Sequence, residues 1–178
     1  DTETGLEQDL QRGCFATDRI PAGIVLACDS TEGRDTGRRR TATLELLTPS
    51  GRTILTSAAY TGSGKSAVGH WRWATVSPDG ETLLAQWGGE CEVPEAFFVP
   101  TEGGTPRPVV ADAGRYPPNS NALGWAEDGR AIVYVWSIEA AACGSGMDEP
   151  GVYLIDPYGA PPELLFPTRG GAVMWTSL

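Results

Sequence analysis

Residues 62–66 (GSGKS) have the composition of a phosphate-binding loop. A complete P-loop also has a glycine five residues before Gly64, and Ala59 occupies that position. The phosphate normally lies at the N-terminus of a following helix, whereas the residues after Ser66 are typical of a strand that enters a turn. The segment therefore predicts a connector between two β units and not a nucleotide site.

His70 is the single histidine of the chain, so a Ser-His-Asp triad or a histidine-based metal site would depend on it. Neither Ser66 nor Ser145 lies in the Gly-x-Ser-x-Gly pattern that exposes a nucleophilic serine. His70 precedes Trp71 at an expected strand start, which favours a packed structural role. We therefore expect no catalytic residue in this chain, and no enzyme activity.

Residues 29–35 place oxygen-bearing side chains at alternate positions, as in part of a calcium-binding loop. Its candidate ligands are Asp29, Glu32 and Asp35. The segment lacks the glycine at the sixth position of such a loop, and Arg40 replaces the glutamate at the twelfth. Ca²⁺ is the one candidate ion, and we otherwise expect no cofactor.

The four cysteines are Cys14, Cys28, Cys91 and Cys143. They are even in number, and no two of them form the C-x-x-C spacing of a zinc site. This pattern favours two disulfides and hence an extracytoplasmic location, whether secreted, periplasmic or on the outer face of a membrane. Four buried free thiols of a cytosolic protein are the alternative.

The chain has 178 residues, which suits one domain, and a net charge of -10 from 23 acidic and 13 basic residues. Nucleic acids and anionic lipids require a basic surface, so neither is expected as a partner. The basic cluster Arg38–Arg40 could bind an acidic partner or pair with the neighbouring acids. No apolar run approaches the ~20 residues of a membrane span. Because the sequence starts at Asp1, we expect a processed or trimmed product.

Three segments repeat one pattern at a spacing of roughly 50 residues. Each has an apolar strand, a turn that ends in Gly23, Gly80 or Gly129, and a second β-prone strand. Two further strands around a Pro/Gly turn complete each unit. These second halves cover residues 44–57, 96–111 and 152–167. No sustained helical periodicity appears, so the sequence predicts an all-β protein.

The turn residues carry a resemblance to a known repeat. The second unit contains Ser77-Pro78-Asp79-Gly80, the third keeps Trp125, Asp128 and Gly129, and the first keeps Pro21 and Gly23. Over roughly residues 13–178, this pattern resembles the TolB-type, WD-like β-propeller repeat of bacterial exported proteins. Each of these turn residues has a structural role. Asp accepts hydrogen bonds from backbone N–H groups, Gly adopts a positive φ, and Pro fixes the backbone angle φ where the chain enters the turn.

The resemblance implies a partial β-propeller with three four-stranded antiparallel blades and one C-terminal strand. The blades would cover about 13–60, 70–111 and 121–167, the extra strand 171–177, and a polar leader or linker residues 1–12. Propellers close with about 4–8 blades. We therefore expect self-association, or further blades from outside this sequence.

Loops between the second and third strands of such blades project from one end of the molecule. We therefore expect their acids to form one negative rim, which could recognise a basic partner or simply be solvated. The candidate rim residues are Glu90, Glu92, Glu95, Glu139, Asp148 and Glu149. Trp71, Trp73 and Trp87 could line a sugar site, but alternating tryptophans on propeller strands are more often core.

The repeat indicates a fold and leaves function open. We expect a non-enzymatic, exported module that binds a protein or a cell-envelope component, or that assists assembly. The alternatives are the propeller portion of a larger envelope hydrolase and the sensor ectodomain of a membrane-anchored regulator. Neither membrane insertion nor nucleic-acid binding is expected of this chain.

The first hairpin also predicts a disulfide pairing. A turn at residues 21–22 places Cys14 opposite position 29, one residue from Cys28, and a β-bulge absorbs such an offset. We therefore expect a Cys14–Cys28 disulfide. The remaining pair, Cys91–Cys143, would join the second blade to the third.

Overall fold

The computed structural model describes six stretches of the chain, which are residues 13–32, 39–61, 69–88, 94–110, 119–136 and 149–168. These residues form twelve strands and no helix. The described part accordingly contains no helix capable of crossing a membrane.

The strands form three sheets, each a meander of four antiparallel strands joined in chain order. The first sheet comprises β1 (Cys14–Ile20), β2 (Gly23–Glu32), β3 (Arg39–Thr48) and β4 (Gly51–Thr61). The second comprises β5 (His70–Val76), β6 (Thr82–Gly88), β7 (Pro94–Pro100) and β8 (Arg107–Pro108). The third comprises β9 (Ser120–Trp125), β10 (Ala131–Val135), β11 (Gly151–Ile155) and β12 (Glu163–Pro167). The predicted all-β class with three four-stranded antiparallel units is confirmed.

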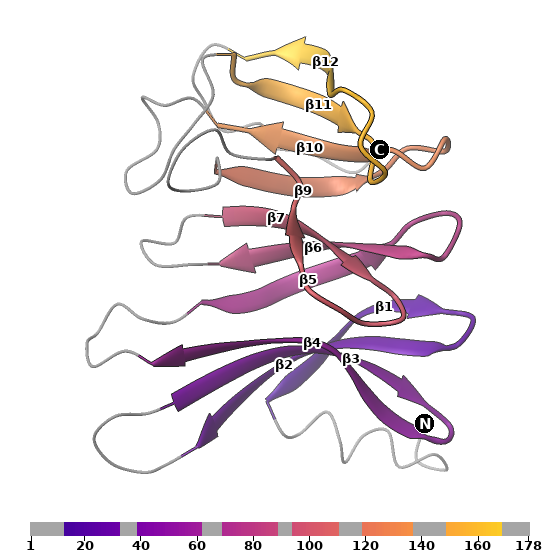
Figure 1. Cartoon of the computed structure of the whole chain (residues 1–178), viewed down its shortest axis with the longest axis vertical. Helices are drawn as coiled ribbons and strands as arrows, with labels where there is room; N and C mark the ends of the chain where they lie inside the picture. Colours follow the sequence, from indigo (N-terminus) through magenta and orange to yellow (C-terminus); the bar gives the residue numbers. More distant parts are fainter. Residues whose placement is uncertain are drawn as a thin grey trace.

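The three sheets follow one another along the long axis of the molecule (Figure 1). One apolar cluster joins the first and second sheets, with Val25, Leu44, Trp71, Leu83 and Trp87 among its members. A second cluster joins the second and third sheets, with Leu84, Phe98, Val133, Tyr153 and Ile155 among its members. Neighbouring residues of β6 therefore belong to different cores, since successive side chains of a strand point to opposite faces.

The tryptophans of the second sheet are part of this core. Trp71 is 3% exposed and Trp87 is 5% exposed. Their rings meet edge to face with centroids 4.8 Å apart, and Trp71 packs similarly against Phe97 at 5.8 Å. Such pairs stabilise a core beyond the area that they bury. Neither indole is available to line a sugar site.

Side-chain hydrogen bonds connect the first strands of the three sheets. The carboxylate of Asp18 on β1 accepts from the Thr75 hydroxyl at 2.9 Å and from the Val76 amide at 2.8 Å, both on β5. The indole of Trp125 on β9 donates to the Thr75 carbonyl at 3.0 Å. Thr75 thus links β5 to both neighbouring sheets.

The predicted Cys14–Cys28 disulfide is confirmed, with the two Cα atoms 4.0 Å apart. The register of β1 and β2 shifts between Ala16 and Asp18, and this bulge brings Cys14 directly opposite Cys28. The amide of Asp29 donates to the carbonyl of residue 13, so the cysteines form a non-hydrogen-bonded pair, the closer of the two antiparallel pairings. Cys91 and Cys143 lie outside the described residues.

Candidate functional site

The turn between β5 and β6 has a network of short hydrogen bonds within the SPDG sequence. The Ser77 hydroxyl donates to Asp79 Oδ1 at 2.5 Å and accepts from the Thr82 amide at 3.0 Å. Asp79 Oδ1 also accepts from the Glu81 amide at 3.0 Å. Gly80 has a φ of 81°, which a residue with a side chain rarely adopts. The network leaves Asp79 Oδ2 and the Glu81 carboxylate directed out of the turn.

A tyrosine from the third sheet contacts these two carboxylates. The hydroxyl of Tyr158, in the turn between β11 and β12, lies 3.0 Å from Asp79 Oδ2 and 3.1 Å from Glu81 Oε2. The Tyr158 amide is itself held by Asp156 at 2.6 Å. A phenol has one hydrogen, so it can donate to only one of the two carboxylates at a time. The other carboxylate is left to accept a hydrogen bond from another donor.

The pKa values of these groups follow from their contacts. The pKa of Asp79 lies below its ordinary value, chiefly because the Ser77 hydroxyl donates to the carboxylate, with further contributions from the Glu81 amide and Tyr158. The pKa of Tyr158 is raised, chiefly by its hydrogen bond to Asp79. The lowered pKa favours the ionised form of Asp79, which maintains the negative charge at this turn.

Arg107 and Phe98 lie near these turns and contact each other. The Arg107 guanidinium lies over the Phe98 ring, 5.1 Å from its centroid, and donates to the carbonyl of Pro157. The Thr101 hydroxyl donates to the carbonyls of Gly80 and Glu81, at 2.9 and 3.1 Å. Thr101 thus joins the turn after β7 to the turn between β5 and β6, and Arg107 joins β8 to the turn between β11 and β12.

Between these turns lies a cleft of about 570 Å³, at the junction of the second and third sheets. Its lining residues are Gly80, Glu81, Thr82, Phe98, Pro100, Thr101, Glu102, Thr105, Arg107, Pro157 and Tyr158. Two glutamates and one arginine line the cleft, and Asp79 adds a third carboxylate beside it. Proline and aromatic rings provide apolar surface next to these acids. Such a cleft suits a ligand with hydrogen-bond donors, a positive charge and some apolar area.

A buried glutamine fixes the two sheets that form the cleft. Gln86 on β6 is 4% exposed. Its Oε1 accepts from the Ala122 amide at 2.7 Å, and its Nε2 donates to the Ser120 carbonyl at 3.2 Å and the Glu95 carbonyl at 3.1 Å. The Ser120 hydroxyl in turn accepts from the Ala96 amide at 3.0 Å. The Gln86 carboxamide thus contacts the edge of β9 much as the peptide group of a neighbouring strand would.

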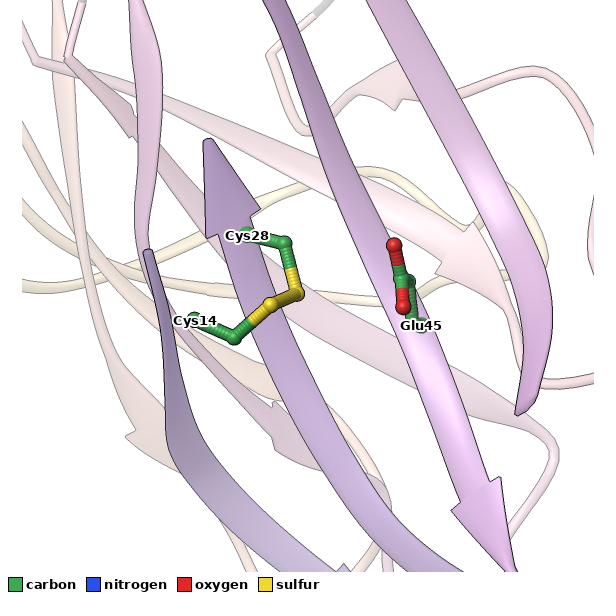
Figure 2. A group of neighbouring side chains, drawn as sticks. All are labelled: Cys14, Cys28 and Glu45. Carbon is green, nitrogen blue, oxygen red and sulfur yellow. A yellow bond between two sulfur atoms is a disulfide. The ribbon is translucent and has the colours of Figure 1, made fainter. Parts of the chain in front are cut away.

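A second polar cluster lies on the first sheet. Cys14, Cys28 and Glu45 come from β1, β2 and β3, and their sulfur and carboxylate atoms all lie within 4.8 Å of one another (Figure 2). In this structure the two sulfurs are joined as a disulfide. Glu45 forms an ion pair with Arg52 at 3.0 Å.

The predicted rim is described only in part. Glu95 lies at the start of β7, Glu149 precedes β11, and Asp29 is near the end of β2. The second strands of the three sheets, β2, β6 and β10, run in the same direction in Figure 1, so the C-terminal ends of these strands lie toward the same end of the molecule. Burial raises the pKa of Glu95. Glu90, Glu92, Glu139 and Asp148 fall outside the described residues, so a shared acidic rim stays a prediction.

The remaining candidates are placed as follows. Asp29 and Glu32 belong to β2, whose ladder with β3 extends to the pairing of Glu32 with Arg39. Asp35 and the GSGKS segment lie outside the described residues, so the calcium site and the connector both stay predictions. His70 is half-buried at the start of β5 and is not among the residues of the cleft.

The sequence predicts the turns around the cleft but not the cleft itself. The residue types of Asp79 and Gly80 predict a tight turn, and the repeat predicts a Pro/Gly turn between the last two strands of each unit. A usable signal existed, because turns at equivalent places in adjacent repeats lie at the same end of their strands. The turn that contains Asp79 and the turn that contains Tyr158 belong to adjacent repeats and lie at the same end of their strands. Comparing the positions of these turns, as well as their residue types, would therefore have predicted that Tyr158 lies near Asp79.

Comparisons of the chain with protein-family models, with curated proteins and with solved structures find no match. The function must therefore be inferred from the site itself.

Proposed function

We propose that this chain is a non-enzymatic, extracytoplasmic binding or assembly module, built as an arc of a TolB-like propeller, whose cleft holds a basic segment of a protein partner. The observation that carries the proposal is the cleft between the second and third sheets, where Glu81 and Glu102 face apolar and aromatic surface. The Tyr158 hydroxyl can donate to only one of the carboxylates of Asp79 and Glu81 at a time, so the other can accept a hydrogen bond from a cationic ligand.

Three features support the proposed arrangement and location. Successive four-stranded meanders pack face to face through apolar clusters, as neighbouring blades do. Their first strands are connected through Thr75, as expected of strands that lie next to a common axis. The Cys14–Cys28 disulfide is typical of oxidising compartments.

The lining of the cleft suits the binding of a basic segment. Its polar side chains are carboxylates, hydroxyls and one guanidinium. Arg107 contacts Phe98 and the Pro157 carbonyl, and among the described residues it forms no ion pair with Glu81 or Glu102. A lysine or arginine side chain of a partner could place its charge at the carboxylates and its methylene groups against the rings.

The test is selection of short random peptides displayed on phage against the intact protein. We expect the selected peptides to be enriched in lysine and arginine and to bind more weakly as salt rises. Glu102→Arg should lower their affinity about tenfold, because it reverses a charge beside the ligand. Glu127→Arg is the matched control, since it makes the same charge change on an exposed turn away from the cleft. Equal effects of both variants, or selected peptides without basic residues, would overturn the proposal.

A separate measurement tests the arc. An arc of three sheets leaves outer faces that blades normally cover, so we expect a defined oligomer by light scattering. A stable monomer that keeps its mass across a wide concentration range would contradict this arrangement and leave the binding proposal standing.

A further inference from the structure

The Cys14–Cys28 disulfide lies on the face of the first sheet that points away from the second. Cys28 packs with Leu26 and Leu47 in a small cluster that is separate from the main inter-sheet core. Leu26 pairs with Glu45 across β2 and β3, so this carboxylate shares the face with the sulfurs. Figure 2 shows the Glu45 side chain next to the disulfide, on the neighbouring strand.

The Glu45 carboxylate is held in place by both of its oxygens. Oε1 accepts from the Thr43 hydroxyl at 2.7 Å, and Oε2 accepts from Arg52 Nη1 at 3.0 Å. The same Arg52 nitrogen lies 3.6 Å from Cys14 Sγ. A carboxylate has about four acceptor positions on its two oxygens, so these bonds leave room for another contact.

We propose that, once this disulfide is reduced, Cys14, Cys28 and Glu45 bind a thiophilic divalent cation of the Zn²⁺ class. In the first step a reductant such as a phosphine breaks the sulfur–sulfur bond. The phosphine takes the oxygen of a water molecule and becomes a phosphine oxide, and the two hydrogens of the water complete the two thiols. In the second step the cation displaces both thiol protons and forms two metal–thiolate bonds and one metal–carboxylate bond.

The spacing of the three ligand atoms suits such a cation. A separation of at most 4.8 Å places them within a small side-chain adjustment of a tetrahedral site with Zn–S bonds of about 2.3 Å. Thiolate ligands favour Zn²⁺ and similar ions over Ca²⁺ or Mg²⁺, which prefer oxygen. Three protein ligands leave the fourth position to water.

Arg52 would complete the charge balance of the site. Two thiolates and one carboxylate around a divalent cation carry one net negative charge, and the neighbouring guanidinium compensates it. Thr43 and Arg52 would then be the residues that orient the Glu45 carboxylate from behind, as the outer partners of metal ligands do. The cation would replace the disulfide as the link between β1 and β2.

The experiment uses the full chain, reduced with a phosphine that is then removed under nitrogen, and titrated with Co²⁺ as a spectroscopic probe for Zn²⁺. We expect thiolate-to-cobalt charge-transfer absorption that saturates at one equivalent and is displaced by Zn²⁺. The variant Cys91→Ser/Cys143→Ser should retain this signal, which assigns it to the remaining pair. In that Cys91→Ser/Cys143→Ser background, the oxidised protein and the further variant Cys14→Ser should lack the signal, and Glu45→Gln should weaken binding about tenfold or more.

Thermal unfolding, followed by tryptophan fluorescence, gives a second readout. Zn²⁺ should raise the melting temperature of the reduced protein and leave that of the oxidised protein unchanged. The proposal is overturned if the reduced Cys91→Ser/Cys143→Ser variant is folded and shows no charge-transfer band. It is overturned equally if that variant unfolds on reduction and Zn²⁺ does not restore its fold.

Discussion

Replacing Gln86 by leucine should destabilise the protein because the buried carboxamide joins two of its sheets. Leucine fills a similar volume but removes one acceptor and one donor from the interface between the second and third sheets. The Ala122 amide then has no acceptor at that position, in a site where Gln86 itself is only 4% exposed. A buried N–H left without a partner costs about 1–3 kcal/mol.

The carbonyls of Ser120 and Glu95 lose a donor in the same variant. Adding a smaller cost for these acceptors gives a total loss of roughly 2–4 kcal/mol. For a chain of this size, such a loss lowers the melting temperature by roughly 5–15 °C. Gln86→Glu keeps the shape, but its ionised carboxylate cannot donate to the carbonyls. Because burial raises the pKa of a carboxyl group, that variant should regain stability as the pH falls.

Urea unfolding followed by tryptophan fluorescence measures these losses. We expect Gln86→Leu to lower the midpoint without changing the slope, since the surface exposed on unfolding is the same. Thr53→Ala on the exposed side of β4 is the control and should stay within about 0.5 kcal/mol of the original protein. A loss below that limit for Gln86→Leu, or a Gln86→Glu variant indifferent to pH, would refute the role assigned to the carboxamide.

Three further outcomes follow from single contacts. Asp18→Ala should cost about 1–3 kcal/mol in urea unfolding, because the Thr75 hydroxyl and the Val76 amide lose their acceptor. Glu95→Gln should raise the melting temperature at pH 7 and have less effect near pH 4, because burial raises the folded-state pKa of this carboxyl and ionisation then opposes folding; an equal effect at both pH values would contradict it. NMR titration should show a larger rise in the pKa of Asp79 in Ser77→Ala than in Tyr158→Phe.

Much of the local structure could be predicted because its causes are local. The SPDG turn folds as expected, since its hydrogen bonds join residues at most five positions apart. The Cys14–Cys28 pairing followed from counting along one hairpin, and the bulge near Ala16 supplies the one-residue offset. Patterns of turns and strands therefore specified the three meanders. They did not specify the length of β2, β3 and β4, which extend well beyond the roughly five to six residues that are usual for strands in globular proteins.

The cleft could not be predicted in the same way because its contacts span distant parts of the chain. Tyr158 reaches Asp79 across 79 positions, and Arg107 reaches Pro157 across 50. Neither pair has a sequence signature, since each residue is also an ordinary turn residue. Their proximity depends on how the second and third sheets pack, and this packing is set by Gln86 and by the apolar cluster around Leu84.

This dependence gives a final prediction that requires no knowledge of the ligand. If Gln86 holds β9 against β6, its loss should also loosen the alignment of the turns, although it does not line the cleft. The Tyr158 hydroxyl would then leave Asp79, and the pKa of Asp79 should rise in Gln86→Leu as it does in Tyr158→Phe. The hydrogen bond from Ser77 lies within one turn, so it should persist and keep the pKa below its ordinary value. An Asp79 pKa that is unchanged in folded Gln86→Leu would show that the cleft is held by its surface contacts alone.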